Sequence, residues 1–311
     1  MAGTAGFRYR MRFICGLIPI AVLLGGCLPA PAPTAVTTST PLPATTTTPS
    51  PAPTAIPSAT PRACLAKPGT FVVDEYLDDD LPRSIPYRVY LPPCYDEAAD
   101  GSLPILVMLH GLLKTDQEWQ DLGIGQEADR LIASGEAPPF LIVLPWQRRG
   151  LEFESALVDH LLPYVEKTYH GAGTRDRRAI GGLSRGGGWA LRIGMKHADV
   201  FGSIGLHSPA VLSPDMYYVA DWIKAMPVEG PRLWIDIGDH DSLRLSVLEL
   251  RDLLDEADYR YTWSLDPGDH TPEYWSGHVE AYLRWYTEPW RRTLPETQTA
   301  PGAGSELRGA G

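Results

Sequence analysis

The sequence predicts a single α/β domain, built on a mostly parallel β-sheet with helices on both faces. Segments of strand character alternate with amphipathic helical segments along most of the chain, as in a series of β-α-β units. Two expected strands, 103–110 and 139–144, are continuous apolar runs, which is typical of strands buried on both faces. The chain has 311 residues, of which 44% are hydrophobic, and this suffices for one such core.

The expected elements follow one another from residue 71 onward. Strands are expected at 71–77 and 86–91 as an antiparallel hairpin, then at 103–110, 139–144, 178–183, 200–207, 232–237 and 259–265. Helices are expected at 126–133, 152–169, 185–196, 243–254 and 273–286. Together they predict a folded domain at 64–294.

The N-terminal segment 1–27 has the features of an export signal. Three arginines precede an apolar run, 13–24, that is short for a bilayer span. The run ends in Leu24-Gly25-Gly26-Cys27, which resembles the bacterial lipobox, where the cysteine is lipidated. We therefore expect an exported protein, anchored to the outer face of the cell membrane through lipidated Cys27. The alternative is a secreted protein with an incidental cysteine.

Two further segments differ in composition from the predicted domain. Residues 28–63 are almost entirely Pro, Thr, Ala and Ser, and such a tract buries too little apolar surface to fold. We expect a disordered linker, up to about 100 Å long at about 3.1 Å per residue. The segment 295–311 is rich in Gly, Ala and Thr and is expected to be a disordered tail.

The net charge and the cysteines indicate which ligands are excluded and which covalent cross-link is expected. The net charge of −11 argues against a nucleic-acid-binding surface, which requires a basic face. Within the predicted domain, Cys64 and Cys94 form an even pair in an exported chain, so we expect a disulfide between them. Two free thiols are the alternative. Neither a C-x-x-C motif nor a Cys/His cluster accompanies them, so no metal site is expected.

One short motif carries the chemistry of the chain. Gly182-Leu183-Ser184-Arg185-Gly186 matches G-x-S-x-G and lies between an expected strand and an expected helix. This pattern places a serine nucleophile on a sharp, strained turn, where a Cβ at the flanking glycines would collide with the neighbouring strand and helix. The simpler interpretation is a glycine-rich loop before an ordinary helix.

A serine nucleophile needs a base and an acid that orients the base, and these follow in the order Ser, acid, His in the α/β-hydrolase fold. Asp241 follows the strand 232–237 and is the expected acid; Asp239 is the alternative. Asp241 would equally suit the start of the next helix as its N-cap. His270 lies in a glycine-containing loop before the last helix and is the expected base.

The oxyanion that forms during acyl transfer needs two fixed N–H donors. The backbone N–H of Arg185 is one expected donor, because it begins the helix after Ser184. The second is expected from the loop after the strand 103–110, where Gly111 permits close approach of the backbone. Leu112 is the expected donor and Leu113 the alternative, with His110 shaping the loop.

With these motifs the chain resembles the Putative esterase family of α/β hydrolases, which includes esterase D-like enzymes, feruloyl esterases, enterochelin esterases and mycolyltransferases. The resemblance spans about 70–290 and is carried by four motifs: Val107-Met108-Leu109-His110-Gly111, Gly182-Leu183-Ser184-Arg185-Gly186-Gly187, Asp236-Ile237-Gly238-Asp239-His240-Asp241 and Gly268-Asp269-His270-Thr271-Pro272-Glu273-Tyr274-Trp275. It implies the α/β-hydrolase fold and a Ser-Asp-His triad without an organic cofactor or a metal.

The sequence thus predicts a serine carboxylesterase that acts on a small or polymer-borne ester. An acyltransferase with the same triad and a non-catalytic, surface-binding module remain as alternatives. Arg185 departs from the family, whose members often carry methionine at this position. It would either favour an anionic acyl group or pair with a buried carboxylate such as Glu154, and we expect the pairing.

Overall fold

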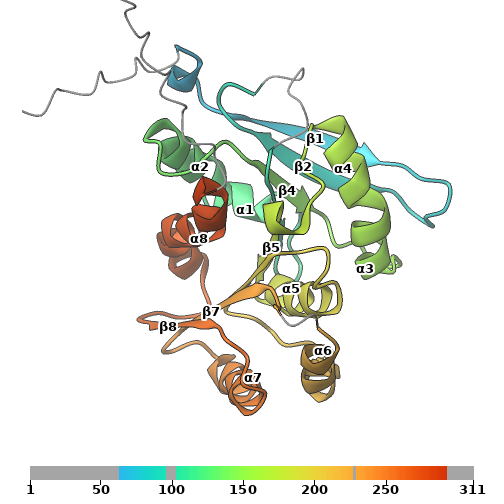
Figure 1. The fold of residues 1–311 in the computed structure, drawn as a ribbon, viewed down its shortest axis with the longest axis vertical. Coiled ribbons are helices and arrows are strands. Elements are labelled where there is room, and N and C mark those ends of the chain that lie inside the picture. The colour runs from blue at the N-terminus through green and yellow to red at the C-terminus, as the bar shows by residue number, and fades with distance from the viewer. Residues whose placement is uncertain (1–62, 96–102, 227–228, 293–311) are drawn as a thin grey trace, which may run out of the picture. The chain divides into compact units, whose positions relative to one another are not determined.

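The computed structural model describes residues 63–95, 103–226 and 229–292, and these residues form an eight-stranded sheet in the order β1-β2-β4-β3-β5-β6-β7-β8 (Figure 1). Only β2 runs antiparallel to its neighbours β1 and β4, and every other pair is parallel. The strands are β1 Thr70–Tyr76, β2 Ile85–Leu91, β3 Ile105–Leu109, β4 Leu141–Pro145, β5 Arg178–Leu183, β6 Ser203–His207, β7 Arg232–Gly238 and β8 Thr262–Asp266.

Helices cover both faces of this sheet, as the sequence predicts. They are α1 Glu118–Asp121, α2 Ile124–Ala133, α3 Phe153–Ser155, α4 Leu162–Thr168, α5 Arg185–Lys196, α6 Val219–Ala225, α7 Arg244–Glu256 and α8 Pro272–Arg292. Short 3₁₀ turns lie at Ala63–Ala66, Arg175–Arg177 and Asp215–Tyr217.

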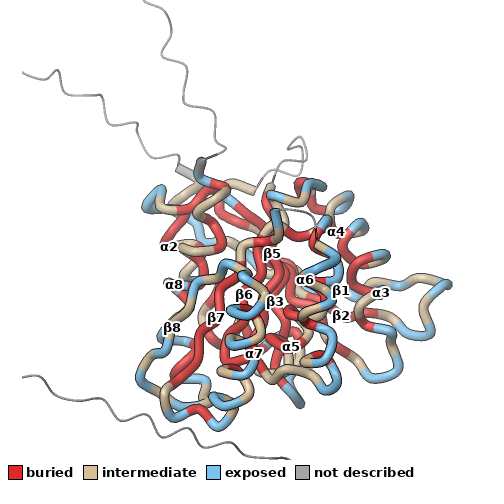
Figure 2. Tube along the Cα trace, turned by 60° about the horizontal axis from the view of Figure 1, so that its bottom comes forward, coloured by how far each residue is buried: buried red, intermediate tan, exposed pale blue. Residues whose placement is uncertain are grey.

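Alternate residues of the central strands supply two separate apolar cores. Ile105 and Val107 of β3 face a core shared with α3 to α7, whereas Leu106 and Met108 face a core shared with α1, α2 and α8. Figure 2 shows the buried residues concentrated along the central strands β3, β5 and β6. A strand buried on both faces must be apolar at every position, which is why β3 and β4 are continuous apolar runs.

The element boundaries differ from the expected ones at a few positions. The expected helix 152–169 contains a π-helical segment, Ala156–Leu161, just before Pro163, which cannot donate a backbone hydrogen bond within a helix. Helix α8 continues past the expected end to Arg292, because Trp290 is buried and donates to the carbonyl of Asp176. The short helices α1 and α6 were not predicted.

The predicted disulfide between Cys64 and Cys94 is present, with a Cα–Cα distance of 5.1 Å. It joins the first 3₁₀ turn to the loop that follows β2. Closing a loop of this length in the unfolded chain stabilises the fold by about 3–4 kcal/mol in the chain-entropy model.

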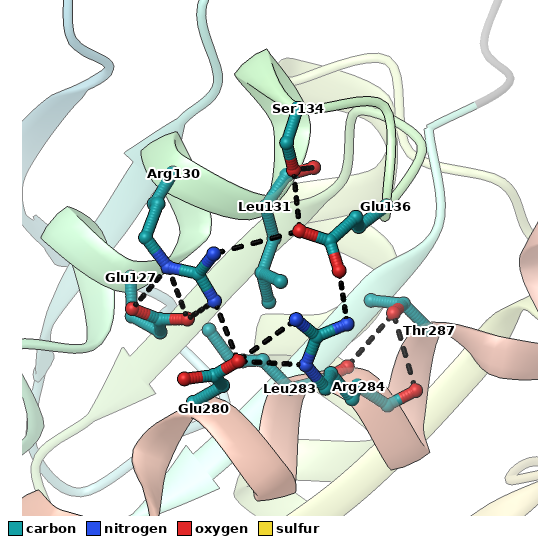
Figure 3. A network of polar contacts seen from close by, with 9 residues as sticks. All are labelled: Glu127, Arg130, Leu131, Ser134, Glu136, Glu280, Leu283, Arg284 and Thr287. Carbon is teal, nitrogen blue, oxygen red and sulfur yellow. Dashed lines mark hydrogen bonds and ion pairs between the residues drawn. The ribbon is translucent and has the colours of Figure 1, made fainter.

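An ion-pair network fastens the last helix to α2 (Figure 3). Arg130 of α2 contacts Glu127 and also Glu280 of α8, at 2.6 and 2.8 Å. Arg284 of α8 contacts Glu280 at 2.8 Å and also pairs with Glu136. Each exposed pair contributes little alone, about 0–1 kcal/mol. Together they fix the orientation of α8, whose first turn follows the loop that carries the expected base.

The expected signal segment 1–27, lipidation at Cys27, linker up to residue 62 and tail 295–311 lie outside the described residues. Within the part of the chain that the structure describes, no helix is both long enough and apolar enough to span a bilayer.

Candidate active site

Ser184 occupies the turn between β5 and α5 in a strained backbone conformation, with φ 53° and ψ −120°. A positive φ is unfavourable for a residue with a side chain, and such strain costs about 1–3 kcal/mol. The Ser184 amide donates to the carbonyl of His207 at the end of β6, 3.0 Å away. The turn therefore holds the hydroxyl at the carboxyl edge of the sheet, where ligands bind in open α/β folds.

The two glycines of the motif are required by close backbone contacts. A Cβ on Gly182 would lie 2.5 Å from the carbonyl carbon of Gly186 and 2.9 Å from the Leu109 oxygen. A Cβ on Gly186 would overlap the carbonyl group of Leu109. The predicted reason for these glycines is thus confirmed: α5 leaves the turn so steeply that it passes against β3 and β5.

Two loops bring the expected base and acid to this serine. His270 lies between β8 and α8, and its Nε2 is 2.9 Å from Ser184 Oγ. Its Nδ1 is 2.8 Å from Oδ2 of Asp241, which follows β7. Residues far apart in the sequence thus form a continuous hydrogen-bonded chain from carboxylate to imidazole to hydroxyl.

The electrostatics of Asp241 fix the direction of these hydrogen bonds. Its side chain is fully buried, which opposes ionisation, but hydrogen bonds from His270 and from the Leu243 amide outweigh burial and lower its pKa. The carboxylate is therefore ionised and accepts the proton of His270 Nδ1. In the neutral imidazole with its proton on Nδ1, the other ring nitrogen, Nε2, is the acceptor for the hydroxyl proton of Ser184, 2.9 Å away.

The neighbouring aspartates have different partners. Asp239, the alternative acid, accepts from the Gly268 amide at 2.9 Å and contacts the exposed His240 at 2.7 Å. These bonds tie the loop after β7 to the loop that carries His270. Asp241 is not the N-cap that the sequence also allowed: Leu243 holds that position before α7, without a side-chain capping bond. The second oxygen of Asp241 instead accepts from the Leu243 amide at 2.8 Å, which fixes the carboxylate in the loop.

A buried polar cluster lies next to the serine turn, and no sequence motif indicates it. Asp236 of β7 accepts from His207 at 2.6 Å, from Tyr282 at 2.8 Å and from Tyr274 at 3.1 Å. Tyr286 reaches the other ring nitrogen of His207 at 3.0 Å. Because His207 also accepts the Ser184 amide through its carbonyl, this cluster supports the turn from below.

The loop after β3 carries the expected second oxyanion donor, and Glu118 anchors it. The Gly111 amide donates to Glu118 Oε2 at 2.7 Å, and burial raises the pKa of this carboxyl group. Leu112 follows with its side chain 58% exposed, and Leu113 has a positive φ of 62°. Glu118 was missed because nothing in its own sequence neighbourhood distinguishes it from an ordinary surface glutamate.

His110 shapes this loop, as the sequence predicts, by bridging it to the loop after β4. Its Nε2 accepts from the Gln147 amide at 2.9 Å, so Nδ1 carries the proton and donates to the Gly111 carbonyl at 2.8 Å. Burial lowers the pKa of His110, which favours the same neutral form.

Three tryptophans lie near the catalytic edge: two of them are buried, and the third lines a surface cleft. Trp275 packs edge-on against the His270 ring, with centroids 4.9 Å apart, and restricts its rotation. Trp119 is buried and donates to the Leu109 carbonyl at 3.0 Å. Trp146 is partly exposed and lies under Arg148.

The expected pairing of Arg185 with Glu154 is wrong. Glu154 contacts Lys196 at 2.6 Å and His197 at 3.0 Å, both from the end of α5. Arg185 begins that helix, and its side chain instead lines a cleft with His110 and Leu112. The helix separates the two ends by three turns, so position along α5 decides which cation Glu154 can reach.

Fold and site together define an α/β hydrolase: a mostly parallel sheet, a strained serine after its central strand, and a histidine and an aspartate at the same edge. The chain belongs to the family described as "Putative esterase", whose model matches residues 79–300. The expected fold and family are therefore both confirmed.

The proteins and solved structures to which this chain is similar are named as esterases and hydrolases. An endo-1,4-beta-xylanase/feruloyl esterase of Xylanibacter ruminicola is 30% identical over an alignment of 144 positions, and the match covers 41% of this chain and 20% of that protein. The chain thus spans about a fifth of that relative's length. A solved ferulic acid esterase is 26% identical, with a TM-score of 0.65 over 72% of this chain and 100% of its own. S-formylglutathione hydrolase of Staphylococcus aureus, 19% identical over 70% of this chain and 96% of its own, shares the fold with a TM-score of 0.61.

Proposed function

We propose that this protein is an exported serine carboxylesterase that forms an acyl-enzyme on Ser184. The observation that supports this proposal most directly is the hydrogen-bonded chain from Asp241 through His270 to the strained Ser184. Such a chain activates a hydroxyl that is otherwise a poor nucleophile at neutral pH. Family membership supports the same reaction class.

In the first half of the reaction, Ser184 Oγ attacks the ester carbonyl while His270 Nε2 takes the hydroxyl proton. Asp241 stabilises the imidazolium that results. The backbone N–H groups of Arg185 and Leu112 receive the oxyanion, and the first N–H groups of a helix have no intrahelical partner to compete for them. His270 then gives its proton to the departing alcohol, which leaves the acyl group on Ser184.

In the second half, water takes the place of the alcohol. His270 removes a proton from the water, and the hydroxide oxygen bonds to the acyl carbon. The tetrahedral intermediate collapses, the bond to Ser184 Oγ breaks, and the proton on His270 returns to the serine. The products are a carboxylic acid and an alcohol, so the cycle needs no redox partner.

Export to the outer face of the membrane is part of the proposal. The Cys64–Cys94 disulfide supports it, because disulfides persist outside the reducing cytosol. The lipobox-like Leu24-Gly25-Gly26-Cys27 favours a lipid anchor on Cys27 over free secretion. Metabolic labelling with an alkyne fatty acid tests this: the full chain should be labelled and a Cys27→Ser variant should not. An unlabelled wild-type chain would exclude the anchor.

The reaction is tested with an ester panel of varied acyl length and aromaticity, including methyl ferulate because relatives are named feruloyl esterases. Wild-type protein should hydrolyse at least one ester and be labelled on Ser184 by a fluorophosphonate. Ser184→Ala should do neither while melting at a similar temperature. If the folded wild-type protein neither hydrolyses an ester nor is labelled, the esterase proposal fails and the non-catalytic binding module is the remaining interpretation.

The acyltransferase alternative is separated by adding acceptors to the same reaction. Candidate sugars and lipids are supplied with an activated ester, and the products are divided into free acid and transferred acyl group. A hydrolase gives mainly free acid at every acceptor concentration. If most of the acyl group is transferred to an acceptor, the protein is an acyltransferase and the esterase proposal is wrong.

A further inference from the structure

A cleft of about 310 Å³ opens beside the candidate oxyanion loop. Three loops and the start of α5 form its walls: Arg83 comes from the β1–β2 loop, Lys114 from the loop after β3, Arg149 from the loop after β4, and Arg185 from α5. The cleft adjoins the proposed catalytic centre, since Arg185 immediately follows the nucleophile and Leu112 of the candidate oxyanion loop also lines the wall.

The lining of this cleft is cationic and contains no carboxylate. Arg83, Arg148, Arg149, Arg185 and Lys114 all line it. Of these, Arg148 pairs with Glu75 at 3.5 Å, outside the lining, whereas the other four form no ion pair with any residue of the described ranges. A basic cluster is notable in a chain with 38 acidic and 27 basic residues.

Arg185 is a partly buried cation of this cleft, whereas Arg83, Lys114 and Arg149 are exposed. Burial lowers its pKa, and the neighbouring guanidinium of Arg149 lowers the pKa further. A guanidinium stays charged at neutral pH despite such a shift, so two positive charges without an ion-pair partner among the described residues lie near each other in the lining of the cleft. This arrangement is unfavourable for the empty protein and becomes favourable when an anion enters between them.

Three other partly buried arginines are neutralised by carboxylates, in contrast with Arg185. Arg88 contacts Asp116 at 2.9 Å, Arg178 pairs with Glu166, and Arg192 forms a bidentate pair with Asp215. At these three positions the fold supplies a carboxylate for the guanidinium. At Arg185 the protein supplies none.

We infer that this cleft binds a carboxylate of the substrate, so that the preferred esters carry a negative charge near the scissile bond. The inference rests on the proposed esterase function, because it assigns the cleft to the substrate of Ser184. Guanidinium groups bind carboxylates through paired N–H donors, which both orients the ester and strengthens its binding. The charge can reside in the acyl part or in the alcohol part, and the two are separated experimentally.

The first arm compares esters of matched length that differ in charge. For the acyl part, mono-4-nitrophenyl adipate is compared with 4-nitrophenyl hexanoate. For the alcohol part, 4-carboxyphenyl acetate is compared with 4-carbamoylphenyl acetate. Rates measured with Ser184→Ala are subtracted as spontaneous hydrolysis. The anionic ester of one pair should have a kcat/KM about tenfold higher than its neutral partner, and salt should reduce this preference. Equal values in both pairs would overturn the inference.

The second arm removes cations that take no part in the proposed chemistry. Arg149→Gln and Arg83→Gln should each lower kcat/KM for the preferred anionic ester by about three- to tenfold and leave the neutral ester unchanged. Arg260→Gln is the matched control, since Arg260 is exposed and precedes β8 at the opposite edge of the sheet. An anionic preference that survives the double variant Arg83→Gln/Arg149→Gln contradicts the inference.

A binding measurement keeps this inference separable from the proposed function. Adipate and its neutral analogue adipamide are titrated calorimetrically into Ser184→Ala. Adipate should bind, Arg149→Gln should weaken its binding, and adipamide should not bind. If wild-type protein hydrolyses no ester of the panel, the proposed function fails. The titration then decides by itself whether the cleft binds a carboxylate. Equal behaviour of adipate and adipamide then overturns the cleft assignment.

Discussion

Replacing Asp241 by asparagine tests the proposed mechanism most directly, because it changes the charge of one buried side chain and almost nothing of its shape. Asp241 makes two hydrogen bonds, to the Leu243 amide and to His270 Nδ1, both at 2.8 Å. An asparagine keeps the first bond with its carbonyl oxygen. Its amide group then faces His270 and donates, so Nδ1 must become the acceptor and the ring proton moves to Nε2.

The size of the effect follows from that tautomer. A protonated Nε2 cannot accept the proton of Ser184, and the imidazolium loses its buried counter-charge. We expect kcat to fall by about 10³–10⁴-fold, which is about 4–5.5 kcal/mol of transition-state stabilisation. Thermal stability should change far less, because volume and one hydrogen bond are conserved. The assay is the initial rate of 4-nitrophenyl acetate hydrolysis, with circular dichroism to confirm the fold.

Asp239→Asn is the matched control for this experiment. It lies two positions away, and its carboxylate accepts from the Gly268 amide and contacts His240 rather than His270. Its replacement should cost less than about tenfold in kcat, through slight displacement of the loop. The reasoning is refuted if Asp239→Asn is the slower variant, or if Asp241→Asn retains more than a tenth of the wild-type rate.

Three further predictions concern the frame of the site. Gly186→Ala should prevent folding or lower the free energy of unfolding by more than about 3 kcal/mol in urea denaturation, whereas Gly277→Ala, with open space around it, should be neutral or stabilising. Glu118→Ala should cost about 1–3 kcal/mol in the same assay, because it leaves a buried amide unpaired; Glu118→Gln, which retains an acceptor, should restore that loss. Acid should destabilise the wild type more than Asp241→Asn. The depressed pKa of Asp241 means that its contribution is present above the ordinary value of 3.8 and lost as the pH falls through the lower folded value, which melting curves below pH 4 measure. Identical acid profiles of these two proteins would contradict this assignment.

Local sequence determined much of the fold and of the reactive turn. The continuous apolar runs at β3 and β4 can be satisfied only by a sheet covered on both faces, so the α/β class followed from them. Strand β5 and helix α5 have the expected boundaries, 178–183 and 185–196, because Gly182 and Gly186 allow the close backbone approach that the sharp turn around Ser184 requires. Chain order, together with a glycine-containing loop before the last helix, also pointed to His270.

Tertiary structure decided everything that depends on which side chains meet across loops. Asp239 and Asp241 are the same residue type in the same loop, and only the packing of that loop against the β8–α8 loop turns Asp241 toward His270. Glu118 is a helical glutamate by sequence and becomes the anchor of Gly111 only because α1 packs beneath the loop after β3.

Arg185 shows the same division between sequence and tertiary structure. Its position after the nucleophile could be read from the motif, but the direction of its side chain could not. Glu154 was a plausible partner by composition, yet it lies at the far end of α5, within reach of Lys196 and His197. The sequence determined a serine on a strained turn. The three-dimensional arrangement decided its hydrogen-bonded partners and the cationic cleft beside it, because pairing energies depend on distances between segments that the chain order leaves free.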